Sequence, residues 1–163
     1  MNHSKNQRRN RLQKGRHSIQ GAYYFLTTVT SNRKPILSNS EMAQLIFQAF
    51  EWLEAQNRIN CQNRINWICI MIMPDHVHVV LQLGHNQTLP KVMHSLKSFT
   101  AKQINKRRSE AGSVWQEGYY EHGIRGDESL NEIIRYCYEN PVRKGLVERA
   151  RDYPYWWCKF RME

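Results

Sequence analysis

Two apolar segments separated by only two residues constrain the fold of this chain more than any other feature of its sequence. Arg64–Met73 contains the uninterrupted apolar run Trp67–Met73, and His76–Leu83 follows directly after Pro74-Asp75. A two-residue link between two strand-forming segments predicts a β-hairpin. The apolar run is far shorter than the roughly 20 residues that a membrane-spanning helix needs, so we expect a globular domain without a membrane partner.

The segments on either side of this hairpin alternate between strand and helix patterns. Aromatic and β-branched residues indicate a strand over 22–30, and apolar residues at helical spacing indicate a helix over 41–57 with Ser40 as its N-cap. After the hairpin we expect a helix over 88–108, a strand over 119–125, and a helix that Asp127 caps and Pro141 ends or bends. The order β-α-β-β-α-β-α predicts an α+β fold, a ferredoxin-like antiparallel sheet of four to five strands with packed helices.

Length and charge narrow the class of protein further. A chain of 163 residues fits one domain, and we expect a basic arm over 1–18, the folded domain over 19–150 and an aromatic tail over 151–163. Lys and Arg exceed Asp and Glu by 24 to 14, a net charge of +10 that is typical of nucleic-acid binding. No apolar stretch follows the first residues and no cysteines form a C-x-x-C pair, so we expect no secretory signal, reduced thiols and a cytoplasmic protein.

Two histidines in the second half of the hairpin are candidate metal ligands. Alternate residues of a strand share a face, so Val77 and Val79 should point to the core while His76 and His78 lie together on the opposite face. Two imidazoles on a rigid strand can both bind one cation. The pattern is short, and a pair of ordinary histidines on a half-exposed strand is the alternative interpretation.

The last helix carries two tyrosines, of which only one is placed to work with a polar neighbour. Tyr136 and Tyr138 are two residues apart, so a helix turns them about 200° from each other. Asn140 follows Tyr136 by four residues and shares its face, whereas Val142 takes that place for Tyr138. Taken alone, each tyrosine could equally be a half-buried aromatic with a satisfied hydroxyl.

Four stretches together are much more specific than any one of them. They are Met73-Pro74-Asp75-His76-Val77-His78-Val79-Val80-Leu81, the pair Trp115-Gln116, the run 119–125 (YYEHGIR), and Tyr136-x-Tyr138-x-Asn140-Pro141-Val142-Arg143-Lys144-Gly145. In this combination the chain closely resembles the REP-associated tyrosine transposases, a branch of the single-tyrosine HUH transposases of IS200-like insertion sequences. The resemblance extends over about residues 20–155.

The resemblance implies a function and a role for each motif residue. His76 and His78 match the histidines that bind a divalent cation, Mg²⁺ or Mn²⁺, and Asn140 matches the amide position that completes the metal site. Tyr136 matches the nucleophile. Such proteins cut single-stranded DNA beside palindromic hairpins, form a 5′-phosphotyrosine intermediate and would act in the cytoplasm at the nucleoid. Asp75 stands where many relatives have Asn or Glu.

The partner we expect is hairpin DNA with a single-stranded flank, bound by basic residues and by aromatic residues that stack on bases. The candidates for this contact are Arg8, Arg9, Arg11, Lys97, Lys102, Arg107, Arg108, Trp115, Tyr119, Tyr120, Arg125, Arg143 and Lys144. The chain is expected to act as a monomer or a homodimer. Two alternatives stay open: a hairpin-binding regulator of the same fold with little or no cleavage, and an unrelated His-x-His metalloenzyme.

Overall fold

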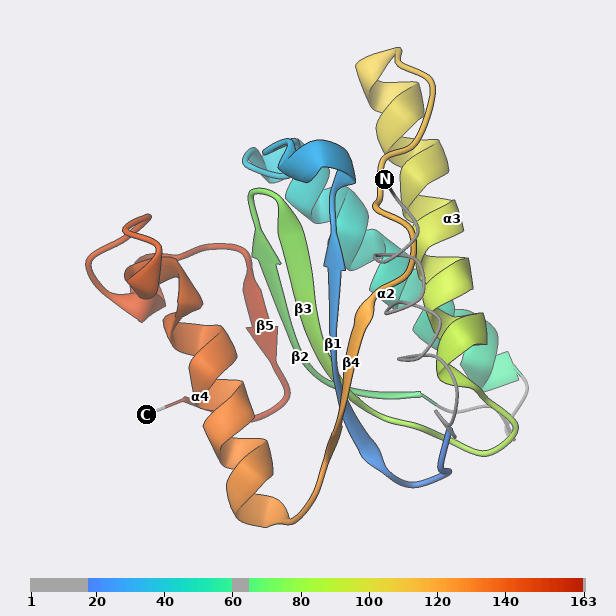
Figure 1. Ribbon diagram of the computed structural model, residues 1–163, viewed down its shortest axis with the longest axis vertical. Coiled ribbons are helices and arrows are strands. Elements are labelled where there is room, and N and C mark those ends of the chain that lie inside the picture. The colour runs from blue at the N-terminus through green and yellow to red at the C-terminus, as the bar shows by residue number, and fades with distance from the viewer. Residues whose placement is uncertain (1–17, 60–64, 163) are drawn as a thin grey trace, which may run out of the picture.

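The computed structural model describes residues 18–59 and 65–162. Five strands form one sheet in the order β4-β1-β3-β2-β5, and every neighbouring pair is antiparallel (Figure 1). The strands are β1 (Tyr23–Val29), β2 (Asn66–Met73), β3 (His76–Gln82), β4 (Tyr120–Ile124) and β5 (Trp156–Cys158). The expected hairpin is β2–β3, in which Met73 pairs with His76 across the turn at Pro74 and Asp75. The predicted ferredoxin-like α+β fold is confirmed.

Three helices cover the two faces of the sheet. Helices α2 (Ser40–Ile59) and α3 (Leu89–Arg108) pack on one face, and α4 (Asp127–Arg143) lies on the other (Figure 1). Strands β2 and β3 are therefore buried on both sides, which explains their nearly continuous apolar sequence. Two short 3₁₀ turns complete the fold, η1 (Ser31–Arg33) after β1 and η2 (Ala150–Asp152) after α4.

The hydrophobic core is divided by the sheet into two layers. Val77, Val79 and Leu81 belong to the layer under α2 and α3, as their alternation predicted. On the opposite face Ile134 and Cys137 of α4 pack against the sheet. The histidines of β3 therefore face α4, the helix that carries both tyrosines.

Two helix ends differ from the sequence-based expectation. Asn39, not Ser40, caps α2: its Oδ1 accepts a hydrogen bond from the Met42 amide at 2.9 Å. Gly126 occupies the N-cap position of α4 with φ of 77°, a conformation that suits glycine.

The sequence predicted that Pro141 ends or bends α4, and the structure shows that Pro141 lies within the helix and does not end it. A proline lacks one amide hydrogen and so removes one hydrogen bond, but the next turn closes because the Lys144 amide donates to the Asn140 carbonyl at 3.0 Å. The helix thus continues to Arg143 and holds that side chain in fixed relation to Tyr136.

The aromatic tail contributes a fifth strand that the sequence did not reveal. Cys158 pairs with Cys69 and Trp156 with Met71, so β5 covers the outer edge of β2. Tyr153 donates a hydrogen bond from its hydroxyl to the Ile72 carbonyl at 2.7 Å, and burial raises the pKa of Tyr153 to about 12. The tail is therefore tied to the sheet by its backbone and by a phenol that stays protonated.

Across the described parts of the chain, no helix has the length and apolar character that would let it cross a membrane.

Candidate active site

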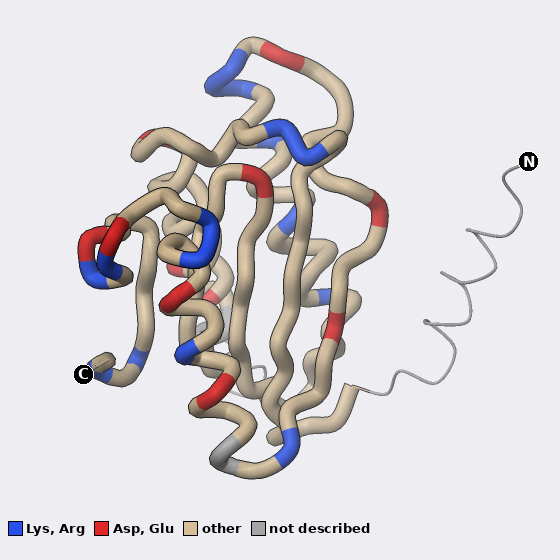
Figure 2. The backbone as a smooth tube through the Cα atoms, turned by 60° about the vertical axis from the view of Figure 1, so that its left-hand side comes forward, with Lys and Arg blue, Asp and Glu red and all other residues tan. Residues whose placement is uncertain are grey.

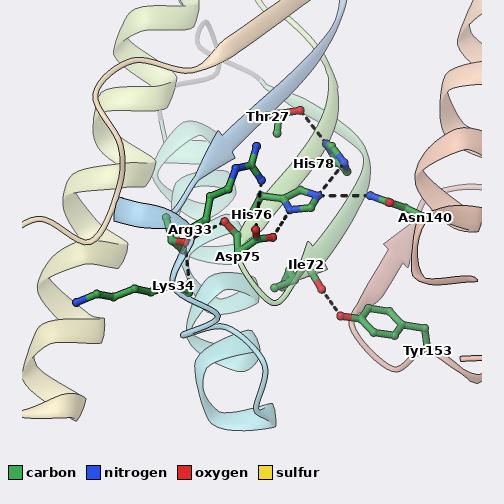
Figure 3. Close-up of polar contacts among 10 residues, drawn as sticks. Thr27, Arg33, Lys34, Ile72, Asp75, His76, His78, Asn140 and Tyr153 are labelled. Carbon is green, nitrogen blue, oxygen red and sulfur yellow. Dashed lines mark hydrogen bonds and ion pairs between the residues drawn. The ribbon is translucent and has the colours of Figure 1, made fainter. Parts of the chain in front are cut away.

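The two histidines of β3 meet at their imidazole Nε2 atoms. His76 and His78 are each only 7% exposed, and their Nε2 atoms lie 3.1 Å apart (Figure 3). They occupy the face of the sheet that α4 covers, as the alternation of β3 predicted. They are buried rather than half-exposed, so their polar atoms need partners within the protein.

Each imidazole is held by a second side chain at its other nitrogen. Asp75 accepts a hydrogen bond from His76 Nδ1 at 2.6 Å, and Thr27 of β1 lies 2.8 Å from His78 Nδ1 through its Oγ1 (Figure 3). A carboxylate can only accept, so the His76 proton is on Nδ1 and its Nε2 presents a lone pair. The Thr27 hydroxyl can either donate or accept.

Burial makes both histidines poor bases. It lowers the pKa of His76, although Asp75 acts in the opposite direction, and it lowers the pKa of His78 to about 3 with a further contribution from the charge of His76. The pKa of Asp75 is also lowered, because the hydrogen bonds and charges of His76 and Arg33 outweigh the effect of burial. At neutral pH the site therefore holds two uncharged imidazoles, the form that binds metals, beside an ionised carboxylate.

Asn140 brings a third polar side chain to the same point from α4. It is 3% exposed, and its amide nitrogen lies 3.4 Å from His76 Nε2 (Figure 3). Amide oxygen and nitrogen are exchanged by a 180° turn of the group, so the same position can present an oxygen. Among the described residues no three His, Cys, Asp or Glu side chains gather as a metal-binding group, and so an amide would have to supply the third ligand.

These three residues suit a divalent cation. Two ligand atoms each about 2.1 Å from one cation are separated by about 3.0–3.4 Å in octahedral or tetrahedral geometry. The 3.1 Å between the Nε2 atoms of His76 and His78 falls within that range. Two nitrogens and one amide also leave coordination positions for oxygen atoms of another molecule.

Tyr136 lies one helical turn before Asn140 and beside the histidines. The centroid of its ring is 6.1 Å from that of His78 and 6.2 Å from that of Phe25 of β1, with the Tyr136 and Phe25 rings nearly perpendicular. The side chain is 48% exposed, so a substrate can approach it from solvent. The Tyr138 ring instead packs on Trp156 of β5, with 5.5 Å between the two ring centroids. The structure therefore brings Tyr136 and Asn140 together with the histidines and leaves Tyr138 out, as the helical spacing predicted.

Cations surround this group. The Arg143 guanidinium lies over the Tyr136 ring, and the charges of Arg143 and Lys144 contribute to the lowered pKa of His78. Arg33 of η1 forms an ion pair with Asp75 at 3.2 Å. Figure 2 shows Lys and Arg positions gathered mainly at the end of the sheet that holds the β2–β3 turn. An approaching polyanion would meet positive charge here.

Two residues of this site were missed by sequence reasoning. Arg33 lies in η1, where Asn32 and Arg33 adopt positive φ values of 54° and 51°. Asparagine favours this conformation, but nothing in the sequence indicates that Arg33 would pair with Asp75. Thr27 pairs directly with His78 in the β1–β3 register, and this register is a property of the fold that the sequence alone does not reveal.

The other candidates for DNA contact are distributed unevenly. Tyr120 is exposed at the start of β4 and Lys144 at the end of α4, both at the histidine end of the sheet. Lys102 lies on α3, where Arg107 and Arg108 pair with Glu41 and Glu110. Arg8, Arg9 and Arg11 lie outside the described residues. Contact of these residues with DNA stays a prediction.

The structure corrects the expectation for Trp115. It is 6% exposed, and its Nε1 donates a hydrogen bond to Thr100 Oγ1 at 2.9 Å, so it is a core residue that no base can stack on. Tyr119 is partly buried against the same core layer.

Two basic candidates also have other surroundings than expected. Lys97 is half-buried and donates from Nζ to the carbonyls of Gln116 and Gly118 at 2.7 and 2.6 Å, so it holds the segment before β4. Arg125 follows the far end of β4, about 20 Å along the sheet from the histidines, and does not surround Tyr136.

The family model for IS200-like transposases matches residues 18–140, which include both histidines, Tyr136 and Asn140. The chain belongs to this family. Among curated relatives, the "Putative REP-associated tyrosine transposase" of Haemophilus influenzae is 29% identical over 147 residues, covering 83% of this chain and 79% of the relative. The REP-associated tyrosine transposase of Escherichia coli is 26% identical over 144 residues, covering 86% and 78%. The resemblance to this branch is confirmed.

Solved structures show the same fold for this IS200-like transposase. A REP-associated tyrosine transposase bound to a REP hairpin matches with a TM-score of 0.71 at 21% identity, covering 88% of this chain and 81% of that one. A putative transposase from Deinococcus radiodurans matches with a TM-score of 0.53 at 22% identity, covering 78% and 96%.

Proposed function

We propose that this IS200-like transposase is a cation-dependent endonuclease and strand transferase that cuts single-stranded DNA beside palindromic hairpins. The observation that carries the proposal is the meeting of Tyr136, an exposed phenol on α4, with the buried imidazole pair of β3 and with Asn140. A nucleophile beside a candidate cation site, with Arg33, Arg143 and Lys144 nearby, suits phosphoryl transfer, which depends mainly on positioning and electrostatics.

In the proposed reaction the Tyr136 hydroxyl oxygen attacks the scissile phosphorus. The new bond joins the phosphate to the tyrosine, and the bond from phosphorus to the 3′-oxygen breaks. The phenolic proton leaves to solvent and a proton from solvent completes the free 3′-hydroxyl. The protein keeps a 5′-phosphotyrosine link to the downstream fragment. Because that link conserves the phosphodiester energy, reversal with another 3′-end joins strands and consumes no nucleotide cofactor.

His76, His78 and Asn140 would hold the divalent cation, Mg²⁺ or Mn²⁺. When bound, it would withdraw negative charge from the scissile phosphate. Asp75 and Thr27 orient the imidazoles, and burial keeps both imidazoles uncharged at neutral pH. Magnesium prefers oxygen ligands, so the two nitrogens favour Mn²⁺ in vitro.

The proposed substrate is a DNA hairpin with a single-stranded flank. One structural neighbour is bound to a REP hairpin, and this chain has a net charge of +10. Arg143 and Lys144 are placed for backbone phosphates next to Tyr136, and exposed Tyr120 is placed to stack on an unpaired base. Tyr136 and the histidines meet within one chain, which supports a monomer as the active unit. Such a substrate would place the activity in the cytoplasm at the nucleoid.

The test is trapping of the covalent intermediate. The wild-type protein is incubated with hairpins whose single-stranded flank is randomised and whose 3′ end is labelled, because the protein stays on the downstream fragment. We expect a slow-migrating, protease-sensitive labelled species on a denaturing gel with Mg²⁺ or Mn²⁺ and none with chelator. Hairpin binding without any adduct would favour the regulator of the same fold. Cleavage without an adduct would show that the reaction does not pass through a phosphotyrosine, and would contradict the proposed role of Tyr136.

A further inference from the structure

Thr27 is the partner of His78 on the neighbouring strand. The two residues are paired in the β1–β3 register, and Oγ1 of Thr27 lies 2.8 Å from Nδ1 of His78 (Figure 3). We propose that Thr27 is a positioning residue that lets His78 exchange its ring proton between two nitrogens and so become a cation ligand. This inference rests on the proposed function, because it concerns the same site.

The hydrogen-bond partners of the two imidazoles indicate where the protons lie in the protein without a cation. Asp75 accepts a hydrogen bond from the protonated Nδ1 of His76, so Nε2 of the uncharged His76 ring is an acceptor. His78 Nε2 lies 3.1 Å away, and two facing lone pairs at that distance would repel. The arrangement is satisfied when His78 carries its proton on Nε2 and donates it to His76. His78 Nδ1 then accepts a hydrogen bond from the Thr27 hydroxyl.

Cation binding requires the opposite arrangement at His78. A ligand nitrogen offers its lone pair, so His78 Nε2 has to be free of its proton and Nδ1 has to carry it. The Thr27 hydroxyl then rotates and accepts from Nδ1. The partner of His78 Nδ1 has to donate a hydrogen bond when the proton is on Nε2 and accept one when the proton is on Nδ1. A hydroxyl can do both. The two histidines thus differ: His76 is locked by a carboxylate, and His78 is adaptable.

The next residue of β1 supplies a matched control. Thr28 is buried on the opposite face of the same strand, and its hydroxyl is without a hydrogen-bond partner. Thr28→Val therefore removes a hydroxyl of the same kind, at nearly the same place, without touching the histidines. Thr27→Val removes the hydroxyl at His78 while the side-chain shape is kept, and Thr27→Ser restores it.

The experiment measures Mn²⁺ affinity by titration calorimetry in the full chain, without DNA. Removal of a group that orients a ligating histidine weakens metal affinity by about 10- to 100-fold. We expect that loss in Thr27→Val, near wild-type affinity in Thr27→Ser, and no change in Thr28→Val. A purely structural role of Thr27 would instead lower the melting temperature without this ordering of affinities.

A second readout needs no variant. Side-chain ¹⁵N NMR of the wild-type protein should show His78 protonated at Nε2 without a cation and at Nδ1 with saturating Mg²⁺. Protonation at Nδ1 in the cation-free protein overturns the inference even if Thr27→Val does not fold. Unchanged Mn²⁺ affinity in Thr27→Val overturns it as well. If the wild-type protein binds no Mn²⁺, or His76→Ala binds it equally well, the proposed cation site itself fails and the inference with it.

Discussion

The Arg143 guanidinium lies over the ring of Tyr136, with its central carbon 4.1 Å from the ring centroid. The same side chain donates a hydrogen bond from Nη2 to the Tyr136 carbonyl at 2.6 Å. Because α4 continues past Pro141, Arg143 is fixed two turns after Tyr136 on the same side of the helix. One arginine thus holds both the ring and the backbone of the proposed nucleophile.

Replacing Arg143 with Gln should slow adduct formation with little effect on the fold. The contacts of Arg143 with Tyr136, and its ion pair with Glu139 at 3.9 Å, are at an exposed surface, where a cation–π contact contributes about 0.5–1 kcal/mol. Misplacing a reacting group by about 1 Å can cost roughly 100-fold in rate, so we expect a loss of about 10- to 100-fold in single-turnover rate at saturating DNA. Arg149→Gln, which breaks an exposed ion pair with Asp152, is the control. Equal rates for Arg143→Gln and the wild type would contradict this role.

Loss of either histidine should separate cutting from binding. His76→Ala and His78→Ala remove a proposed cation ligand, whereas the hairpin stem is expected to be held by basic side chains elsewhere. We predict no detectable adduct and hairpin affinity within about threefold of wild type by fluorescence anisotropy, since phosphate contacts dominate affinity. Chelator should have the same effect on the wild type, reversed by Mn²⁺. Full adduct formation in excess chelator would refute the cation requirement.

The buried histidines should make stability depend on pH when no cation is present. In the unfolded chain a histidine takes up a proton near pH 6.5, but folded His78 does so only near its lowered pKa of about 3. The unfolded state therefore binds more protons between these values, and stability falls as the pH drops through that window. For His78 alone we expect a loss of about 2 kcal/mol between pH 7.5 and pH 5.

Urea unfolding in chelator at the two pH values measures this loss. His78→Gln lacks the titrating group and should lose correspondingly less stability than the wild type over the same interval. Identical pH dependence in the two proteins would show that His78 is not held uncharged in the fold.

Two aromatic residues that the sequence did not distinguish should behave differently. Tyr120→Ala should weaken binding of a hairpin with a single-stranded flank by about 1–3 kcal/mol, the contribution of one stacked base, and leave blunt duplex binding unchanged. Trp115→Ala should lower the free energy of unfolding by about 3–5 kcal/mol, because it empties a core position. Filter binding and urea unfolding measure the two effects. A stable Trp115→Ala protein with a specific binding defect would reverse the assignment.

Sequence periodicity predicted most of the fold because the decisive patterns are local. The His76-Val77-His78-Val79 alternation gave the correct faces of β3, and helical spacing separated Tyr136 from Tyr138. Strand β5 was not visible, because three residues in an aromatic segment form a strand only where the β2 edge is available to pair with them. Pro141 does not end α4, because the helix closes one more turn through the Lys144 amide without the missing amide hydrogen.

The residues that meet at the candidate site were predicted from the sequence, whereas the residues that support them were missed. Motif spacing identifies side chains on one element, but the contacts Arg33–Asp75 and Thr27–His78 join different elements. The first joins η1 to the turn between β2 and β3, and the second depends on the register of β1 against β3. Trp115 was wrongly expected to contact DNA. The sequence shows an aromatic residue that could stack on a base, but only the structure shows that this side chain is buried in the core.

The most direct test of the central claim compares Tyr136→Phe with Tyr138→Phe. Each variant loses only a phenolic oxygen and keeps its ring, so folding and hairpin binding should be close to wild type in both. Each is incubated with 3′-labelled hairpin substrate and Mn²⁺ and analysed for the protein–DNA adduct on a denaturing gel. We predict that Tyr136→Phe forms no adduct and that Tyr138→Phe, whose ring packs on Trp156, forms it at the wild-type level. An adduct with Tyr136→Phe, or its loss in Tyr138→Phe alone, would contradict the assignment of Tyr136 as the nucleophile.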